Sequence, residues 1–167
     1  MKPLRAFSIT VAILVIACVV SAAPATNPAW EKMKSLVGEW EGTMDHGGQA
    51  MPVKVSYSLV SSGSSIMERL STPDGSDMVT MYYPDGSGLM MTHYCSEGNQ
   101  PRMKAAPSSG DNLAFNFVDA TGLASPQAEH MNKLVVRFQD ADHFTQEWTH
   151  RKAGKEETGV FKYTRKK

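Results

Sequence analysis

The sequence is poor in cysteine and in net charge, and both shortages exclude classes of protein. Its 167 residues include two cysteines, Cys18 and Cys95. Cys18 lies in an N-terminal segment that we expect to be processed, so the domain keeps Cys95 alone and forms no internal disulfide. The 17 basic and 17 acidic residues balance, which gives no indication of nucleic-acid binding or of a basic membrane-binding patch. We expect the domain to be stabilised by its core alone.

The sequence also lacks the motifs of the common enzyme classes. It contains no glycine-rich phosphate-binding loop and no metalloprotease helix motif. No nucleophile has an evident base beside it, and no pair of carboxylates is singled out. There is no repeat of solenoid length and no linker between domains. The sequence therefore favours a single domain without catalytic function, and it leaves an enzymatic function open.

One long apolar run is present, and it lies at the N-terminus. Lys2 and Arg5 precede an uncharged stretch that ends at Val20 and is followed by small residues. These three parts are typical of a secretory signal peptide, and the run is shorter than the roughly 20 apolar residues of a membrane-spanning helix. We expect a signal peptide over 1–25 and an exported domain over 26–167, periplasmic or secreted, with no transmembrane segment after signal removal.

A second processing route is open. The residues before Cys18, Val-Ile-Ala, are similar to a bacterial lipobox. In that interpretation Cys18 becomes a lipid-anchored N-terminus and the protein is an outer-membrane lipoprotein.

Downstream of residue 38, short runs of alternating polar and apolar residues are separated by turn sequences. Alternation over 53–59, 113–117 and 134–138 predicts strands with one buried face. Pro-Asp-Gly-Ser at 73–76 is typical of the turns between them. The expected strands are 38–45, 52–60, 64–71, 77–83, 88–95, 101–106, 112–118, 132–139, 143–151 and 158–165. A short helix is expected over 30–37, where Trp30, Met33 and Val37 would share one helical face.

The two ends of this strand series favour closure into a barrel. Trp40 lies at the start of the first strand and Arg165 at the end of the last. If these strands pair, the guanidinium stacks on the indole, an interaction of about 0.5 to 2 kcal/mol. We therefore predict an all-β fold, a single antiparallel up-and-down barrel of about ten strands whose short N-terminal helix closes one end.

These residues resemble the signature of a known superfamily. The Gly-x-Trp motif at 38–40 after a short helix, with Arg165 in the last strand, resembles the calycins, which are the lipocalins and the fatty-acid-binding proteins. Ten strands is the number in the fatty-acid-binding branch and in the haem-binding nitrobindins. The Arg-x-Tyr pair by which fatty-acid-binding proteins hold a carboxylate is absent, because the last strand reads Tyr-Thr-Arg at 163–165.

Three further segments resemble an uncharacterised bacterial family of exported lipocalin-like proteins. They are MVTMYYPDGSGLMMTHYC (78–95), GNQPRM (98–103) and HMNKLVVRFQDADHFTQEWT (130–149). This resemblance implies a calycin-like barrel over nearly the whole exported domain, and it implies no established activity.

In a barrel, alternate residues of each strand face the lumen, where we expect a small apolar or amphipathic ligand to bind. The candidate ligand-binding residues are Tyr57, Met91, His93, Tyr94, Asn99, Gln100, Arg102, Phe115, Trp148 and Tyr163. Gln146 and Glu68 lie on otherwise apolar strand faces and are candidate buried polar groups. The alternative for the loop residues is that Asn99 and Gln100 bond their own loop and that Arg102 pairs with an acid such as Glu97 or Glu147.

A second function class is a metal or haem protein. His93 and Cys95 share one strand face and offer soft donor atoms, and His130 is the best third ligand. The alternative is a core histidine beside a buried thiol, in which case no cofactor is expected. A filled barrel with a structural role at the cell envelope is a further alternative. The ligand and the oligomeric state are left open.

Overall fold

The structure is a computed structural model that describes residues 27–46, 48–107 and 110–167. The signal peptide predicted over 1–25 and the lipidation site at Cys18 lie outside the described residues. Among the residues that are described, no helix has the length and apolar character needed to cross a membrane.

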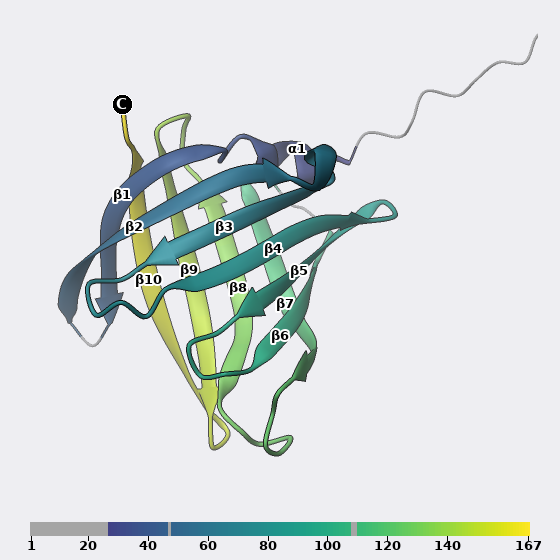
Figure 1. Cartoon of the computed structure of the whole chain (residues 1–167), viewed down its shortest axis with the longest axis vertical. Helices are drawn as coiled ribbons and strands as arrows, with labels where there is room; N and C mark the ends of the chain where they lie inside the picture. Colours follow the sequence, from purple (N-terminus) through teal and green to yellow (C-terminus); the bar gives the residue numbers. More distant parts are fainter. Residues whose placement is uncertain (1–26, 47, 108–109) are drawn as a thin grey trace, which may run out of the picture.

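Ten antiparallel strands form one closed barrel in the described part of the chain (Figure 1). The strands are β1 (Gly38–His46), β2 (Gln49–Val60), β3 (Ser65–Ser71), β4 (Met78–Asp85), β5 (Gly88–Tyr94), β6 (Gln100–Ala105), β7 (Asn112–Thr121), β8 (His130–Phe138), β9 (His143–Lys152) and β10 (Lys155–Arg165). Each pairs with its neighbours in sequence, and β1 closes on β10. The predicted all-β barrel of about ten strands is confirmed.

The predicted strand ranges differ from the observed ones mainly at the hairpins. β2 and β10 each begin earlier than predicted, and the added residues at 49–51 and 155–157 are all exposed. These residues continue the hairpin ladders without burying a face. The alternation of apolar residues therefore could not reveal them.

A short helix, α1 (Pro28–Lys34), precedes the barrel. It begins at Pro28 because the Asn27 side chain accepts a hydrogen bond from the Trp30 amide at 3.1 Å, and because proline suits the first helical position. The helix ends earlier than predicted, and the turn after it buries Leu36 and leaves Val37 36% exposed. The predicted helical face is therefore wrong at Val37.

Trp40 and Arg165 close the end of the barrel that carries α1. They are partners across β1 and β10, and the guanidinium carbon lies 4.0 Å from the indole centroid. The indole N–H donates to the Leu36 carbonyl at 2.7 Å. Arg165 donates to the carbonyls of Ser35 and Val37 at 2.8 and 3.0 Å. The predicted stacking is confirmed, and it also fixes the turn that follows α1.

The two ends of the barrel differ. The helix end carries α1 and the hairpins β2–β3, β4–β5, β6–β7 and β8–β9. The distal end, opposite α1, is formed by the hairpins β1–β2, β3–β4, β5–β6, β7–β8 and β9–β10 (Figure 1). These two names are used below.

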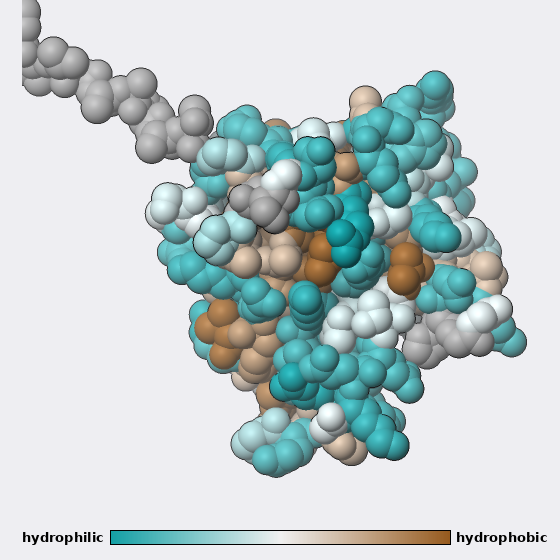
Figure 2. All heavy atoms as spheres, turned by 180° about the vertical axis from the view of Figure 1, so that it is seen from behind, coloured by the Kyte–Doolittle hydropathy of each residue, from teal (hydrophilic) through white to brown (hydrophobic). Residues whose placement is uncertain are grey.

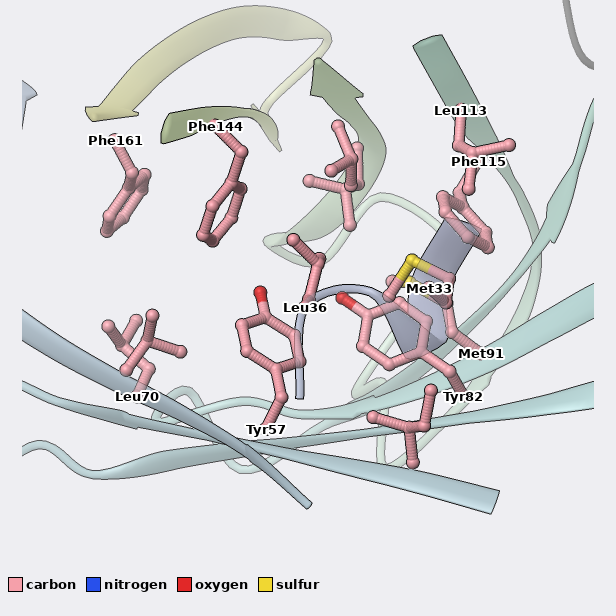
Figure 3. Packing of buried hydrophobic residues seen from close by; sticks show 14 of the residues in the cluster. Met33, Leu36, Tyr57, Leu70, Tyr82, Met91, Leu113, Phe115, Phe144 and Phe161 are labelled. Carbon is pink, nitrogen blue, oxygen red and sulfur yellow. The ribbon is translucent and has the colours of Figure 1, made fainter. Parts of the chain in front are cut away.

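Most of the barrel interior is filled by apolar side chains. Met33 and Leu36 extend inward from the helix end, and Figure 3 shows them among the rings of Tyr57, Tyr82 and Phe115. The outer face seen in Figure 2 is mainly hydrophilic, with apolar atoms in small separate areas. The hydrophobic core therefore lies inside the barrel, and Met33 and Leu36 belong to it.

Gly42 sets how closely β1 and β10 approach. A Cβ at this position would lie 2.0 Å from the Lys162 carbonyl oxygen. We expect Gly42→Ala to lower the free energy of unfolding by about 1 to 3 kcal/mol, because only a backbone shift can relieve such overpacking. Urea unfolding measures the loss. Gly159→Ala is the control, since its nearest neighbours would be 3.9 Å away. Equal losses in the two variants would contradict the close approach.

Candidate functional site

A row of polar side chains lies inside the barrel. The row consists of Tyr57, Glu68, Thr80 and His93. They are register partners on the successive strands β2, β3, β4 and β5, and they are 1 to 3% exposed. Because neighbouring strands lie about 5 Å apart, the four side chains form a continuous polar strip on one wall of the lumen. Gln146, fully buried on β9, reaches this strip from the other wall.

Glu68 is the centre of the buried hydrogen-bond network. Its Oε2 accepts from the Tyr82 hydroxyl at 2.7 Å and from Gln146 Nε2 at 2.9 Å. Gln146 Nε2 also donates to the Tyr57 hydroxyl at 2.9 Å, and Gln146 Oε1 accepts from the Trp148 indole at 3.3 Å. Burial raises the pKa of Glu68, and these donors oppose that rise only in part. The network therefore holds a titratable group in the middle of the barrel.

His93 is buried with one nitrogen unpaired. Its Nδ1 lies 2.9 Å from Thr80 Oγ1, and its ring centroid lies 4.7 Å from that of Trp148. Nε2 has no hydrogen-bond partner among the described residues. Burial lowers the pKa of His93 to about 4, so the imidazole is neutral at pH 7. Because an unpaired buried polar atom is destabilising, Nε2 marks a place where a bound molecule would be favoured.

Glu68, His93 and Trp148 border an inner cavity of about 20 Å³. The remaining lining is apolar and consists of Leu70, Met78, Met131 and Phe161. A cavity of this size holds a group about as large as one water molecule. It is much smaller than a porphyrin.

A larger pocket of about 290 Å³ lies at the distal end of the barrel. Its lining is mainly apolar and includes Met44, Met51 and Val53. It shares Leu70, Met78 and Phe161 with the inner cavity. We call it the mouth pocket. We call the two hollows together the funnel: the shared side chains lie between a mainly apolar pocket at the distal end and an inner cavity bordered by Glu68 and His93.

Other hollows lie outside the barrel. One of about 400 Å³ is bordered by residues of β1, β2 and β3, and one of about 590 Å³ by residues of β1, β9 and β10. A third, also of about 590 Å³, lies beside α1. These are open grooves, whereas the mouth pocket shares three lining residues with the inner cavity, which Glu68 of the buried network borders. We therefore place the candidate site in the lumen.

Six of the ten predicted ligand-binding residues lie inside the barrel. They are Tyr57, Met91, His93, Phe115, Trp148 and Tyr163. His93 and Trp148 border the inner cavity. Met91 and Phe115 are fully buried in the core and pack toward the helix end (Figure 3). Tyr57 belongs to the hydrogen-bond network behind the cavity.

Two of the predicted residues lie on the outer surface. Tyr94 is 50% exposed, because it points away from the lumen on the strand face opposite His93. Arg102 donates from Nε to Asp119 Oδ1 at 2.6 Å, and both side chains are about half exposed. The arginine is thus paired with an acid on the neighbouring strand β7, which is neither of the two acids that the sequence suggested.

Asn99 and Gln100 bond the loops of the distal end. Asn99 is 4% exposed and donates from Nδ2 to the Glu129 carbonyl at 2.8 Å. Gln100 donates to the Gly98 carbonyl at 3.2 Å and accepts from the Thr121 hydroxyl at 2.7 Å. Both amides therefore join the β5–β6 loop to its neighbours, and neither borders the mouth pocket or the inner cavity.

The structure does not bring the three candidate metal ligands together. His130 Nδ1 lies 2.7 Å from the Ala128 carbonyl, and its ring packs on Phe117. Cys95 is buried, and burial raises the pKa of its thiol. Among the described residues, one group of three metal-capable side chains occurs, namely Glu97, Glu129 and His150. His150 Nε2 lies 2.9 Å from Glu97 Oε1, and Lys152 forms an ion pair with Glu129.

Several lining residues were not among the predicted set. Glu68 and Gln146 were recognised as polar residues on apolar strand faces, which is the signal that identifies them. Met78 and Phe161 border both hollows, but their alternation with polar neighbours is the same as that of any core residue. They line the two hollows because they lie near the distal end of the barrel. That position depends on the register of the hairpins.

Comparisons with known proteins show a likeness of fold. No family model matches the chain, and no curated protein matches it. A crystal structure of a protein of unknown function from the DUF3598 family of Nostoc punctiforme is similar, with a TM-score of 0.57, 13% identity and 80% of this chain covered. A redesigned β-barrel gives a TM-score of 0.42 at 12% identity, and the match covers 81% of this chain and 96% of that one. The protein EF1p2_mFAP2b bound to DFHBI gives a TM-score of 0.40 at 13% identity, and the match covers 82% of this chain and 98% of that one. The chain spans about half the length of the DUF3598 protein, 48%. What the comparison establishes is the architecture, a ten-strand antiparallel barrel with a structural neighbour in the DUF3598 family.

Proposed function

We propose that this barrel is an exported calycin-like binding protein that takes a small amphipathic molecule through its distal end. The apolar part of the ligand lies in the mouth pocket, and its polar group reaches the floor formed by Glu68 and His93. The observation that carries this proposal is the buried, unpaired Nε2 of His93 beneath an apolar pocket.

The lining of the mouth pocket suits such a ligand. Met44, Met51 and Met78 contribute flexible, polarizable side chains, which adapt to ligands of different shape. A volume of about 290 Å³ is at the lower limit of small-molecule sites in proteins. The combination of an apolar wall and a few convergent polar groups is the usual character of such sites.

The sequence of the N-terminal segment supports the export part of this proposal. The N-terminal segment over 1–25 has the three parts of a signal peptide. The Gly-x-Trp motif and Arg165 resemble the calycins, and the structure pairs Trp40 with Arg165. A periplasmic or secreted barrel of this type would carry or sequester a molecule outside the cytoplasm.

Binding is tested with an uncharged fluorescent probe, N-phenyl-1-naphthylamine. We expect its emission to rise on addition of the exported domain and to saturate. Met78→Trp fills the passage between mouth pocket and cavity, so we expect the dissociation constant to rise at least tenfold. Met81→Trp is the matched control, because Met81 points outward from the same strand, and its dissociation constant should be unchanged.

Two outcomes would overturn the proposal. One is the absence of saturable binding to the folded wild-type domain. The other is an equal effect of Met78→Trp and Met81→Trp, which would place the probe outside the lumen. Urea unfolding of both variants shows whether each is folded at the binding temperature.

A further inference from the structure

Glu68 is a buried acid to which the described residues give no cationic partner. Its side chain is 2% exposed. The groups that hydrogen-bond to it, the Tyr82 and Tyr57 hydroxyls and the Gln146 amide, are neutral, and no lysine or arginine contributes to its pKa. Fully buried acids in proteins are almost always paired, because an isolated buried charge is strongly unfavourable. A bound cation would supply the missing partner.

The funnel that leads to Glu68 is lined by charges of one sign. Asp74 borders the mouth pocket and Glu68 borders the inner cavity. Neither lining includes a lysine or an arginine. Clefts lined by one sign of charge raise the local concentration of the opposite ion. With Glu68 ionised, the two linings therefore favour a cation over a carboxylate.

The hydrogen-bond capacity left in the cavity is that of acceptors. The Trp148 indole N–H already donates to Gln146, and the Tyr82 hydroxyl donates to Glu68. The hydrogen bonds from Tyr82 and Gln146 both go to Oε2, whereas a carboxylate offers about four acceptor sites over two oxygens. His93 Nε2 accepts when Nδ1–H donates to Thr80. In that tautomer, a ligand group that donates fits this floor, and one that only accepts does not.

The volume of the cavity and the aromatic side chains that border it favour one kind of donor group on the ligand. A volume of about 20 Å³ admits a group the size of one water. A primary ammonium is compact and carries three donors, while a quaternary ammonium is several times larger. Trp148 and Phe161 border the same cavity, and aromatic rings attract cations through their faces.

We propose that the inner cavity selects a primary ammonium group, which donates to the Glu68 carboxylate and to His93 Nε2 while the apolar tail of the ligand occupies the mouth pocket. The inference rests on the proposed lumenal binding function and names its ligand class: apolar primary amines, in preference to alcohols, carboxylic acids and quaternary amines.

The test is a series of ligands with the same tail. Octylamine, 1-octanol, octanoic acid and octyltrimethylammonium are titrated at pH 7 against the domain loaded with N-phenyl-1-naphthylamine, and displacement is measured. We expect octylamine to bind at least tenfold more tightly than 1-octanol and octyltrimethylammonium, and octanoate to bind more weakly than the alcohol.

A variant then assigns the selectivity to Glu68. Glu68→Gln keeps the size of the side chain and an acceptor for Tyr82, and it removes the charge. We expect the ratio of octylamine to octanol affinity to fall to within about twofold, with octanol binding unchanged. If this variant does not fold, the ligand series on the wild-type domain still tests whether the site prefers a primary ammonium group.

The outcomes separate this inference from the proposed function. If the probe does not bind the wild-type domain, the lumenal function itself fails. If the probe binds and octanoate displaces it as well as octylamine does, the ammonium inference fails and the lumenal function stands. An unchanged amine-to-alcohol ratio in a folded Glu68→Gln variant also overturns the inference, because the selectivity would then arise elsewhere.

Discussion

Replacing Trp40 with alanine is expected to lower the free energy of unfolding by about 3 to 5 kcal/mol, the largest loss that we expect from one substitution. Trp40 is 2% exposed, its ring centroid lies 4.7 Å from that of Phe144 in a T-shaped arrangement, and the guanidinium of Arg165 lies on its face. The substitution leaves a cavity where β1, β10 and the turn after α1 meet, and it removes the donor to Leu36. Urea unfolding followed by circular dichroism measures the loss.

Trp40→Phe separates the loss of the indole hydrogen bond from the loss of the packed aromatic ring. It keeps an aromatic ring beneath Arg165 and removes the indole N–H, so the Leu36 carbonyl loses its partner. We expect a loss of about 1 to 3 kcal/mol from the unpaired carbonyl, clearly smaller than that of Trp40→Ala. If the two variants lose the same amount, packing and stacking of the ring are not what close the helix end.

The fold could be predicted because its signals are local or lie at the two ends of the barrel. Alternation and turn sequences define each strand without reference to the others. Closure required one additional inference, that Trp40 and Arg165 meet, and this pair belongs to the first and last strands. The helical face was wrong at Val37 because the chain leaves the helix before that residue, and no residue pattern marked the change.

The candidate site was harder to predict because it depends on pairings across the barrel. Glu68, Thr80 and His93 lie in one row only because two successive hairpins place them in register. Gln146 meets Glu68 from a position 78 residues away in sequence. Residue type and parity gave the correct side of the sheet for Glu68, His93 and Gln146. The convergence of these groups on one cavity depends on barrel closure and shear, which a single sequence does not specify.

Acidification is expected to destabilise the fold through His93. Burial lowers its pKa to about 4, whereas histidine in an unfolded chain titrates near 6.5. Between these values the unfolded chain binds a proton that the folded chain does not, so the free energy of unfolding falls as the pH falls. From pH 7.5 to 4.5 we expect His93 to account for a loss of about 2 to 3 kcal/mol.

Glu68 has the opposite dependence, so the wild-type curve alone does not isolate His93. Burial raises the pKa of Glu68, and its protonation in the folded state adds stability as the pH falls. His93→Gln keeps Glu68 and a group able to bond Thr80, and it removes the titration. We expect the wild-type protein to lose about 2 to 3 kcal/mol more than His93→Gln between pH 7.5 and 4.5 in urea unfolding. Parallel curves would mean that His93 accepts its proton in the folded barrel, and its Nε2 would then be a donor that repels the ammonium ligand and favours an anion instead.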